Sequence, residues 1–211
     1  MNLISLTFDD GPNTVTTPHV LDVLEENEIV ASFFLIADSI TAESAQVVRR
    51  AVSMGCEIEN HSTTHSFMSK MTPEQIQRET TNCTQKILDI TSRSPRFFRP
   101  PYIDVNQTMF DEIDLTFICG SGCKDWIPDT SVEERIRLLL ENARDGELIL
   151  LHDMPGNINT VEALKTVIPE LKKRDFRFVT CAQLFDKCKI IPNHNWLYSN
   201  VFQTEPRNGL Q

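Results

Sequence analysis

The sequence predicts an α/β protein whose parallel strands close into an irregular barrel of about seven strands. Short, mostly apolar runs alternate with longer stretches of helical periodicity six or seven times along the chain. This alternation is typical of a parallel sheet, because each parallel connection needs a crossover, usually a helix. Titratable or aromatic residues follow five of the predicted strands, as expected for a barrel that collects its functional groups at the carboxyl ends of its strands.

The first half of the chain alternates regularly between strand and helix. The helix after the first strand carries apolar residues at helical spacing, and Gly55 ends the second helix. Thr72, Pro73 and Gln75 form a typical helix start, with an N-cap, a proline at the first position and a capping-box glutamine. The predicted strands of this half are residues 3–8, 31–36 and 57–60, and its predicted helices are residues 18–27, 42–54 and 72–91.

The second half continues the same alternation. Its predicted strands are residues 96–98, 115–119, 148–151 and 177–180, and its predicted helices are residues 132–143 and 161–174. We expect residues 1–190 to form one domain. The tail, residues 191–211, carries Trp196, Tyr198 and Phe202, and we expect it to pack on the domain through these rings or to be partly disordered.

Composition and charge exclude several classes of protein. The 211 residues include 30 acidic and 20 basic ones, a net charge of -10, which argues against a nucleic-acid partner and suits a neutral or cationic substrate. No apolar run approaches the ~20 residues of a membrane span, so no membrane partner is expected. The start lacks a secretory signal, which predicts a cytoplasmic protein if the sequence is complete and an extracellular one if it is a mature or excised portion. The six scattered cysteines predict mostly buried free thiols, with at least one disulfide as the alternative.

The residues that follow the strands suggest a metal site. His61 and His65 are four apart and would share a face if their segment were helical. One carboxylate from Asp9 and Asp10 would complete a His₂Asp set, which binds zinc or another first-row divalent ion and leaves positions open for water and substrate. The second carboxylate would then be available as a base. His152 follows an apolar strand where that strand should end, and Asp153 beside it favours a position at a polar rim.

Each of these features also has a simpler interpretation. The two histidines of the pair could be exposed or core residues, and Asp-Asp-Gly-Pro is good turn chemistry. His152 could be a buried core histidine, and Arg99 a surface charge. Arg99 nevertheless lies between two phenylalanines and two prolines, a stiff apolar setting in which an arginine usually has a carboxylate partner.

Taken together, five short motifs resemble the polysaccharide deacetylase family, the NodB-homology domain also called carbohydrate esterase family 4. The resemblance covers residues 3–185, and the motifs occur in the family's order. They are TFDDGP at 7–12, HSTTH at 61–65, RPPY at 99–102, DW at 125–126 and LLH at 150–152.

The resemblance implies a NodB-like deacetylase barrel, a catalytic domain over residues 1–190, and a role for each motif residue. It implies one divalent metal ion, zinc or cobalt first and nickel or manganese as alternatives. The implied metal ligands are Asp10, His61 and His65. The implied catalytic residues are Asp9 as the general base, Arg99 as its orienting partner, His152 as the general acid and Asp125 as the partner of His152. The implied substrate contacts are the backbone N–H of Tyr102 toward the oxyanion, with Trp126 and Leu150 around the acetyl methyl group.

The implied activity is removal of acetyl groups from a polysaccharide or oligosaccharide. Residues 96–106 and 125–128 look most like clostridial acetylxylan esterase members, which favours O-acetylated xylan, although Ile103-Asp104 departs from the family's usual continuation. The alternatives are N-deacetylation of chitin oligomers or peptidoglycan, and a catalytically silent relative that binds glycan. Hydrolysis of another bond, such as a phosphodiester, is less favoured, since Gly120 and Gly122 are expected to shape a groove-lining loop rather than a phosphate site. The sequence makes no prediction of oligomeric state.

Overall fold

A single sheet of nine strands, all paired in parallel, organises the computed structural model, which describes residues 2–206. The strand order is β6-β7-β1-β2-β3-β4-β5-β9, and β8 pairs with β1 beyond this path. The predicted α/β fold with a parallel barrel is confirmed. The strands are β1 (Asn2–Asp9), β2 (Ser32–Leu35), β3 (Glu57–Asn60), β4 (Phe97–Phe98), β5 (Thr116–Ile118), β6 (Ser121–Gly122), β7 (Glu147–His152), β8 (Phe176–Phe178) and β9 (Leu197–Tyr198).

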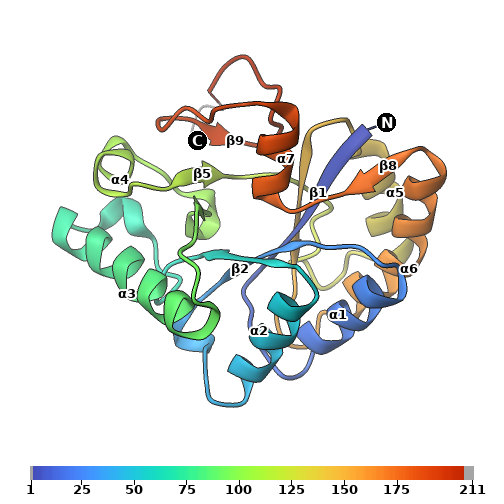
Figure 1. Ribbon diagram of the computed structural model, residues 1–211, viewed down its shortest axis with the longest axis horizontal. Coiled ribbons are helices and arrows are strands. Elements are labelled where there is room, and N and C mark those ends of the chain that lie inside the picture. Colours follow the sequence, from blue (N-terminus) through green and yellow to red (C-terminus); the bar gives the residue numbers. More distant parts are fainter. Residues whose placement is uncertain (1, 207–211) are drawn as a thin grey trace.

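Helices cover the outside of this sheet (Figure 1). The helices are α1 (Thr17–Glu26), α2 (Ser44–Ser53), α3 (Pro73–Thr91), α4 (Gln107–Glu112), α5 (Val132–Asn142), α6 (Ile158–Lys173) and α7 (Cys181–Cys188). Short 3-10 helices lie at Ala37–Ser39, Met68–Lys70 and Pro101–Ile103. The capping box predicted at the start of α3 is present, with the Thr72 hydroxyl accepting from the Gln75 N–H. None of the helices described is both long and apolar enough to span a bilayer.

One stretch of chain, residues 116–122, closes the barrel. β5 pairs with β4, and two residues later β6 pairs with β7, at Ser121 with Ile149 and at Gly122 with Leu150. Gly120 between them has φ +105°, and a Cβ there would lie 2.9 Å from the Leu148 carbonyl oxygen, so this close approach requires glycine. The glycine segment that the sequence assigned to a loop is therefore partly a strand.

Strand alternation separates the core into an outer and an inner layer. Ile4, Leu6 and Phe8 of β1 pack in the large apolar cluster with the covering helices. The intervening residues face the barrel interior, where the Thr7 hydroxyl donates to the Ile149 carbonyl over 2.6 Å and Asp9 reaches the far end. Interior polar side chains thus lie in a row that leads along β1 toward its carboxyl end.

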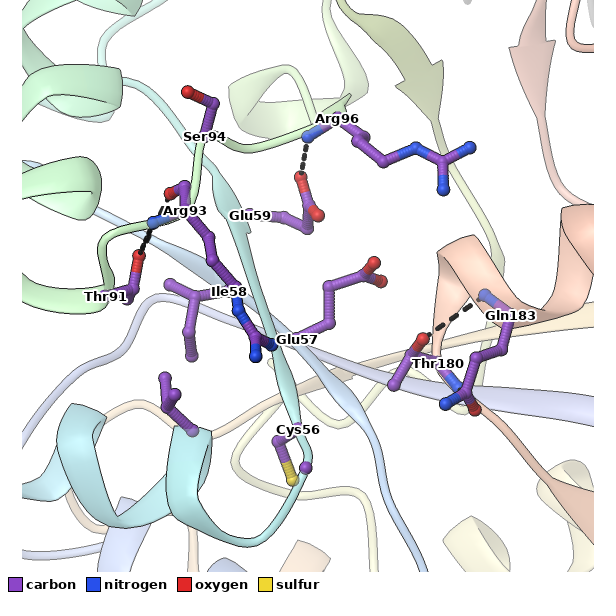
Figure 2. A pocket seen from close by; sticks show the side chains of 12 residues that line it. Cys56, Glu57, Ile58, Glu59, Thr91, Arg93, Ser94, Arg96, Thr180 and Gln183 are labelled. Atoms are coloured by element: carbon purple, nitrogen blue, oxygen red, sulfur yellow. Dashed lines mark hydrogen bonds between the residues drawn. The ribbon is translucent and has the colours of Figure 1, made fainter.

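Two glutamates of β3 fasten the opposite, amino-terminal end of the barrel. Glu57 and Glu59 extend from the same side of β3 (Figure 2). Glu59 accepts the backbone N–H groups of Arg96 and Phe97 at 2.8 and 2.7 Å, and Glu57 accepts the Ser32 hydroxyl at 2.8 Å. Burial, followed by the charge of Glu57, raises the pKa of Glu59 well above its ordinary value. These bonds fix β3 against β2 and β4, the strands on either side of it.

Helix α7 and the tail seal the same end. α7 packs in an inner apolar cluster with Phe34, Phe97 and Leu148, and β9 of the tail pairs with β5. Trp196 and Tyr198 join this cluster, and Phe202 lies against Gly146. Residues 191–206 therefore pack on the barrel, and the rest of the predicted tail, residues 207–211, lies outside the described residues.

Four elements differ from the sequence prediction. The helices α4 and α7 and the two-residue strands β6 and β9 were not predicted. α4 has six residues, and β6 and β9 have two each, too few to show a period. The predicted buried thiols are present at Cys83, Cys123 and Cys181, and burial raises the pKa of each to about 12.

Candidate active site

The carboxyl ends of β1, β3 and β7 and the loops after β4 and β6 surround a cavity of 340 Å³. Eight of the predicted site residues line it, and the other two, Arg99 and Asp125, lie directly behind lining residues. The lining residues are Asp9, Asp10, His61, His65, Pro100, Tyr102, Ile103, Trp126, Leu150 and His152.

Asp10, His61 and His65 form a triad suited to a metal ion. Their candidate ligand atoms all lie within 4.8 Å of one another, and Asp10 Oδ1 is 3.5 Å from His61 Nε2 and 3.3 Å from His65 Nε2. Asp10 Oδ1 is buried without a hydrogen-bond partner. His61 Nδ1 donates to the Arg99 carbonyl over 2.6 Å, and since a carbonyl only accepts, Nε2 keeps its lone pair for the triad. The donor set therefore fits a divalent first-row ion.

The protonation states of the triad agree with this. Burial alone would raise the pKa of Asp10, but its interaction with His61, followed by those with His152 and His65, outweighs burial and lowers the pKa to about 2. Burial, then the neighbouring His61, lowers the pKa of His65. At neutral pH the triad therefore offers a carboxylate and a neutral imidazole, the forms that bind a metal.

The two histidines do not meet on a helix, the case in which their spacing alone would place them on one face. Residues 61–65 form a turn in which Ser62 and His65 have left-handed backbone, φ 67° and 56°. The Asn60 side chain accepts the Ser62 N–H at 2.8 Å, and the Ser62 hydroxyl accepts the His65 N–H at 3.1 Å. The turn, rather than helical periodicity, brings the two imidazoles within 4.9 Å of each other.

Glu79 of α3, which the sequence did not single out, holds this turn from outside. Its carboxylate accepts the backbone N–H of Thr63 at 3.0 Å and that of Thr64 at 2.8 Å. Its carbonyl accepts the Thr63 hydroxyl at 2.7 Å. Helix α3 thus holds the turn that carries His61 and His65 through one residue.

Asp9 contacts Arg99 through one carboxylate oxygen, Oδ1, and its other oxygen, Oδ2, lies 3.7 Å from His61 Nε2. β1 ends at Asp9, and Asp10 has left-handed backbone, φ 72°, which turns its side chain from the strand's alternation toward the histidines. Arg99 Nη1 donates to Asp9 Oδ1 over 2.5 Å, and both side chains are nearly inaccessible. The Arg99 guanidinium also lies 4.2 Å from the centre of the Phe34 ring. Arg99 therefore has the carboxylate partner that its apolar setting predicted, and that partner is Asp9.

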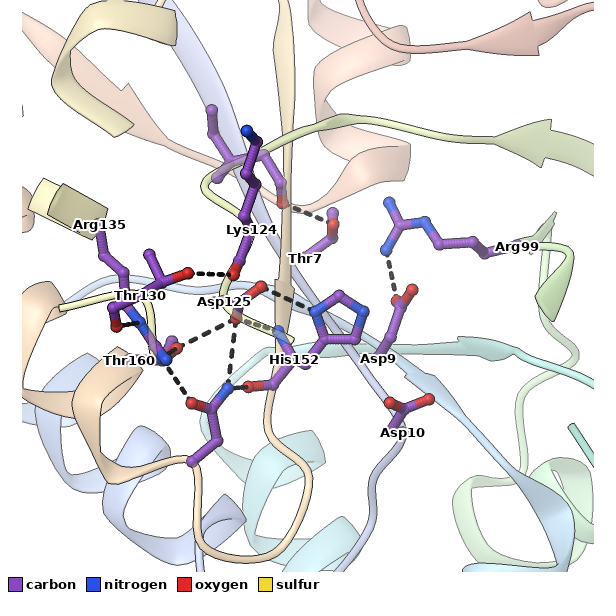
Figure 3. A network of polar contacts seen from close by, with 12 residues as sticks. Thr7, Asp9, Asp10, Arg99, Lys124, Asp125, Thr130, Arg135, His152 and Thr160 are labelled. Carbon is purple, nitrogen blue, oxygen red and sulfur yellow. Dashed lines mark hydrogen bonds and ion pairs between the residues drawn. The ribbon is translucent and has the colours of Figure 1, made fainter. Parts of the chain in front are cut away.

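His152 pairs with Asp125 on the other side of the cavity (Figure 3). His152 Nδ1 and Asp125 Oδ1 are 2.8 Å apart, and Asp125 Oδ2 accepts the His152 backbone N–H at 2.8 Å. Burial would lower the pKa of His152, but the hydrogen bond and charge of Asp125, with Asp9 and Asp10, raise it to about 9. His152 is therefore a proton donor at neutral pH.

The cavity walls are aromatic and partly exposed. Trp126 lies 5.6 Å from the His152 ring, and Tyr102 lies 4.7 Å from the His65 ring. Phe67, which the sequence did not single out, stacks on Tyr102 at 4.0 Å. Tyr102 and Ile103 both have left-handed backbone, φ 59° and 55°, which marks this segment as a constrained rim.

A further carboxyl group supports the loop after β1. Asp153 is buried, its N–H donates to the Asp9 carbonyl over 3.1 Å, and its Oδ2 accepts the Thr17 hydroxyl at 2.5 Å. A Cβ at Gly11 would lie 2.8 Å from this carboxyl group, so glycine is needed where the loop crosses it. Burial raises the pKa of Asp153 to about 7.

The barrel, with a triad that fits a divalent ion and two hydrogen-bonded acid–base pairs at one cavity, fits a metal-dependent hydrolase. The family model described as polysaccharide deacetylase matches residues 1–116, more than half of the chain. The chain belongs to the polysaccharide deacetylase family, as its five motifs indicated.

Similar proteins support the assignment. A bifunctional xylanase/deacetylase from Pseudobutyrivibrio xylanivorans is 45% identical over 200 residues, which are 94% of this chain and 33% of that protein, so the chain spans about a third of this relative's length. A peptidoglycan-N-acetylglucosamine deacetylase from Bacillus cereus is 33% identical over 86% of this chain and 87% of its own length.

Solved structures agree in fold over almost the whole chain. The Xyl-CE4 domain of a multidomain xylanase from the hindgut metagenome of Trinervitermes trinervoides has a TM-score of 0.93 and 41% identity, covering 99% of both chains. A family 4 acetyl xylan esterase from Clostridium thermocellum, solved with a cobalt ion, has a TM-score of 0.92 and 37% identity, covering 95% of this chain and 100% of that one.

Proposed function

We propose that this chain removes acetyl groups from acetylated polysaccharide by metal-dependent hydrolysis, with O-acetylated xylan as its substrate. One observation carries the proposal. The Asp9–Arg99 pair and the His152–Asp125 pair reach the same 340 Å³ cavity that contains the Asp10, His61 and His65 triad. A base, an acid and a metal site around one small cavity suit the hydrolysis of an acyl group.

The roles of the side chains follow from their surroundings. A divalent ion held by Asp10, His61 and His65 would polarise the acetyl carbonyl and lower the pKa of water nearby. Asp9, oriented by Arg99, takes a proton from the attacking water while the oxygen of that water bonds to the acetyl carbon. His152 gives a proton to the sugar oxygen as the carbon–oxygen bond breaks, which yields acetate and a free hydroxyl group. The Tyr102 backbone N–H is assigned to the developing oxyanion, and Trp126 and Leu150 to the acetyl methyl group.

The choice of xylan is supported by the relatives. The relatives with xylan-related names, the xylanase/deacetylase, the multidomain xylanase and the acetyl xylan esterase, share 45%, 41% and 37% identity with this chain. The peptidoglycan deacetylase shares 33%. N-deacetylation of an amino-sugar polymer is therefore the second candidate. Cobalt accompanies the acetyl xylan esterase, and zinc or cobalt is proposed here, with nickel or manganese as alternatives.

Substitutions of the two adjacent aspartates, Asp9 and Asp10, should affect turnover and affinity for the ion separately. Asp9→Asn should retain the ion and lose about 10²- to 10⁴-fold in turnover, the usual contribution of a general base. Asp10→Asn should lose affinity for the ion because it removes a charged ligand. Calorimetric cobalt titration and acetate release measure the two properties.

An exposed aspartate on the outside of the barrel provides the control for this pair. Asp22, on α1, is half-exposed, pairs with Arg50 and does not line the cavity, so Asp22→Asn should change neither property. Near-normal acetate release by Asp9→Asn would refute its assignment as the base.

A further inference from the structure

A buried chain of polar side chains leads from Asp125 away from the cavity to Arg135 of α5 (Figure 3). Arg135 is 2% exposed, and among the described residues no carboxylate forms an ion pair with it. Its Nε donates to the Thr130 carbonyl over 3.0 Å, and its Nη1 donates to Asn157 Oδ1 at 2.5 Å and to Thr160 Oγ1 at 2.7 Å. The buried guanidinium thus donates to two neutral side chains, Asn157 and Thr160, and both of these are hydrogen-bonded to Asp125.

The chemistry of Arg135 fixes the direction of these hydrogen bonds. A guanidinium only donates and stays charged at any working pH. Thr160 Oγ1 must therefore accept from Arg135, and its single proton points to Asp125 Oδ2, 3.0 Å away. Asn157 must present Oδ1 to Arg135, so its Nδ2 faces the His152 carbonyl at 2.8 Å and Asp125 Oδ2 at 3.4 Å.

The donor and acceptor roles in this chain also determine how Asp125 and His152 are hydrogen-bonded to each other. Asp125 Oδ2 receives the Thr160 hydroxyl and the His152 backbone N–H, with the Asn157 amide at longer range. Oδ1 is left as an acceptor, and His152 Nδ1 is the donor that reaches it, 2.8 Å away. With its Nδ1 proton held by Asp125, His152 presents Nε2 to the cavity that it lines.

We propose that Arg135 is a positioning residue for the proton-donating side of the site: its donor-only charge orients Thr160 and Asn157, which in turn fix Asp125 and, through the hydrogen bond at Nδ1, the orientation of His152. The inference rests on the proposed function, in which His152 protonates the leaving sugar oxygen. It adds a residue that acts from behind Asp125 and touches neither substrate nor ion.

The test compares two leaving groups. A sugar hydroxyl needs a proton as it leaves, whereas 4-nitrophenolate leaves readily without one. Arg135→Met should therefore lower kcat on acetylated xylan by about tenfold or more, the usual scale for a residue behind a catalytic or ligating one. It should leave KM, cobalt affinity and 4-nitrophenyl acetate hydrolysis near wild type. Arg137→Met, an exposed arginine of the same helix, is the matched control and should change neither rate.

A second pair of variants covers the case in which Arg135→Met does not fold. Thr160→Ser keeps the hydroxyl that links Arg135 to Asp125, whereas Thr160→Val keeps the shape and loses it. The serine variant should behave as wild type. The valine variant should lose kcat on acetylated xylan while its hydrolysis of 4-nitrophenyl acetate stays near wild type. Equal losses on both substrates in the folded variants, or a serine variant as impaired as the valine one, would overturn the proposal.

A spectroscopic measurement separates this inference from the proposed function. Proton NMR of the resting protein should show a downfield His152 Nδ1 proton in wild type and Thr160→Ser, and its loss in Arg135→Met and Thr160→Val. This result does not depend on turnover. A wild type that keeps the resonance but releases no acetate would count against the proposed function alone. An unchanged resonance in Thr160→Val would count against the inference alone.

Discussion

Asp9 and Asp10 are adjacent in sequence but lie in different electrostatic surroundings. Asp9 continues the alternation of β1 into the barrel and accepts from Arg99, whereas the left-handed backbone of Asp10 turns its carboxylate to two imidazoles. Asp9 alone has the Arg99 charge as a partner, although both carboxylates lie near His61 Nε2, Asp9 Oδ2 at 3.7 Å and Asp10 Oδ1 at 3.5 Å. This difference lets one group be assigned to proton transfer and the other to the ion.

The raised pKa of His152 predicts the alkaline side of the activity profile. Asp125 and the neighbouring carboxylates raise it to about 9, so the proton-donating form persists below that pH and is lost as pH rises through it. The kcat for acetate release, measured with the ion saturating, should therefore fall above about pH 9. An unperturbed histidine would lose its proton near pH 6.5.

Asp125→Asn provides the comparison for this profile. It removes the charge that raises the pKa of His152, so the alkaline fall should move toward neutral pH. An alkaline limb at the same pH in both proteins would show that His152 is not the titrating acid.

At the residue scale, the sequence identified the side chains that face the cavity and their direct partners Arg99 and Asp125, but not the residues behind those partners. The motif residues stand at strand ends, a position that sequence patterns reveal. Arg135, Asn157 and Thr160 act through contacts with residues 22 to 35 positions away, and no local pattern marks such partners. Only the folded arrangement shows that no carboxylate of residues 2–206 pairs with Arg135 and that its partners Asn157 and Thr160 both reach Asp125.

At the scale of elements, helix α3 supports the turn that carries His61 and His65. Glu79→Ala should weaken cobalt binding by about 10- to 100-fold, because the Thr63 and Thr64 N–H groups lose the acceptor that holds the turn. Calorimetric titration measures the change. Glu74→Ala, on the exposed first turn of the same helix, should bind cobalt as wild type does, and equal affinity in Glu79→Ala would refute the supporting role.

The elements that the sequence predicted are those with local signals. The capping box of Thr72 and Gln75 located the start of α3 correctly. The same signature at Thr180 and Gln183 begins α7 and could have revealed that helix. The turn at residues 61–65 could not be separated from a helix by spacing alone, since two left-handed residues, rather than periodicity, create it.

At the scale of the whole molecule, the barrel closes through a short, irregular segment. Residues 116–122 contact β4 at one end and β7 at the other, and β9 fills the remaining edge beside β5. The class and the strand alternation could be predicted, because both depend on apolar runs. The closure depends on the close approach at Gly120, which only the packed structure shows.

The most direct test of the account is acetate release by the purified, metal-free protein before and after addition of cobalt or zinc. Acetylated xylan, acetylated chitooligosaccharides and peptidoglycan are offered in parallel. The account predicts release from xylan that depends on the added ion. Release from the amino-sugar polymers alone would contradict the proposed substrate, and a protein that binds no ion and releases no acetate would contradict the site itself.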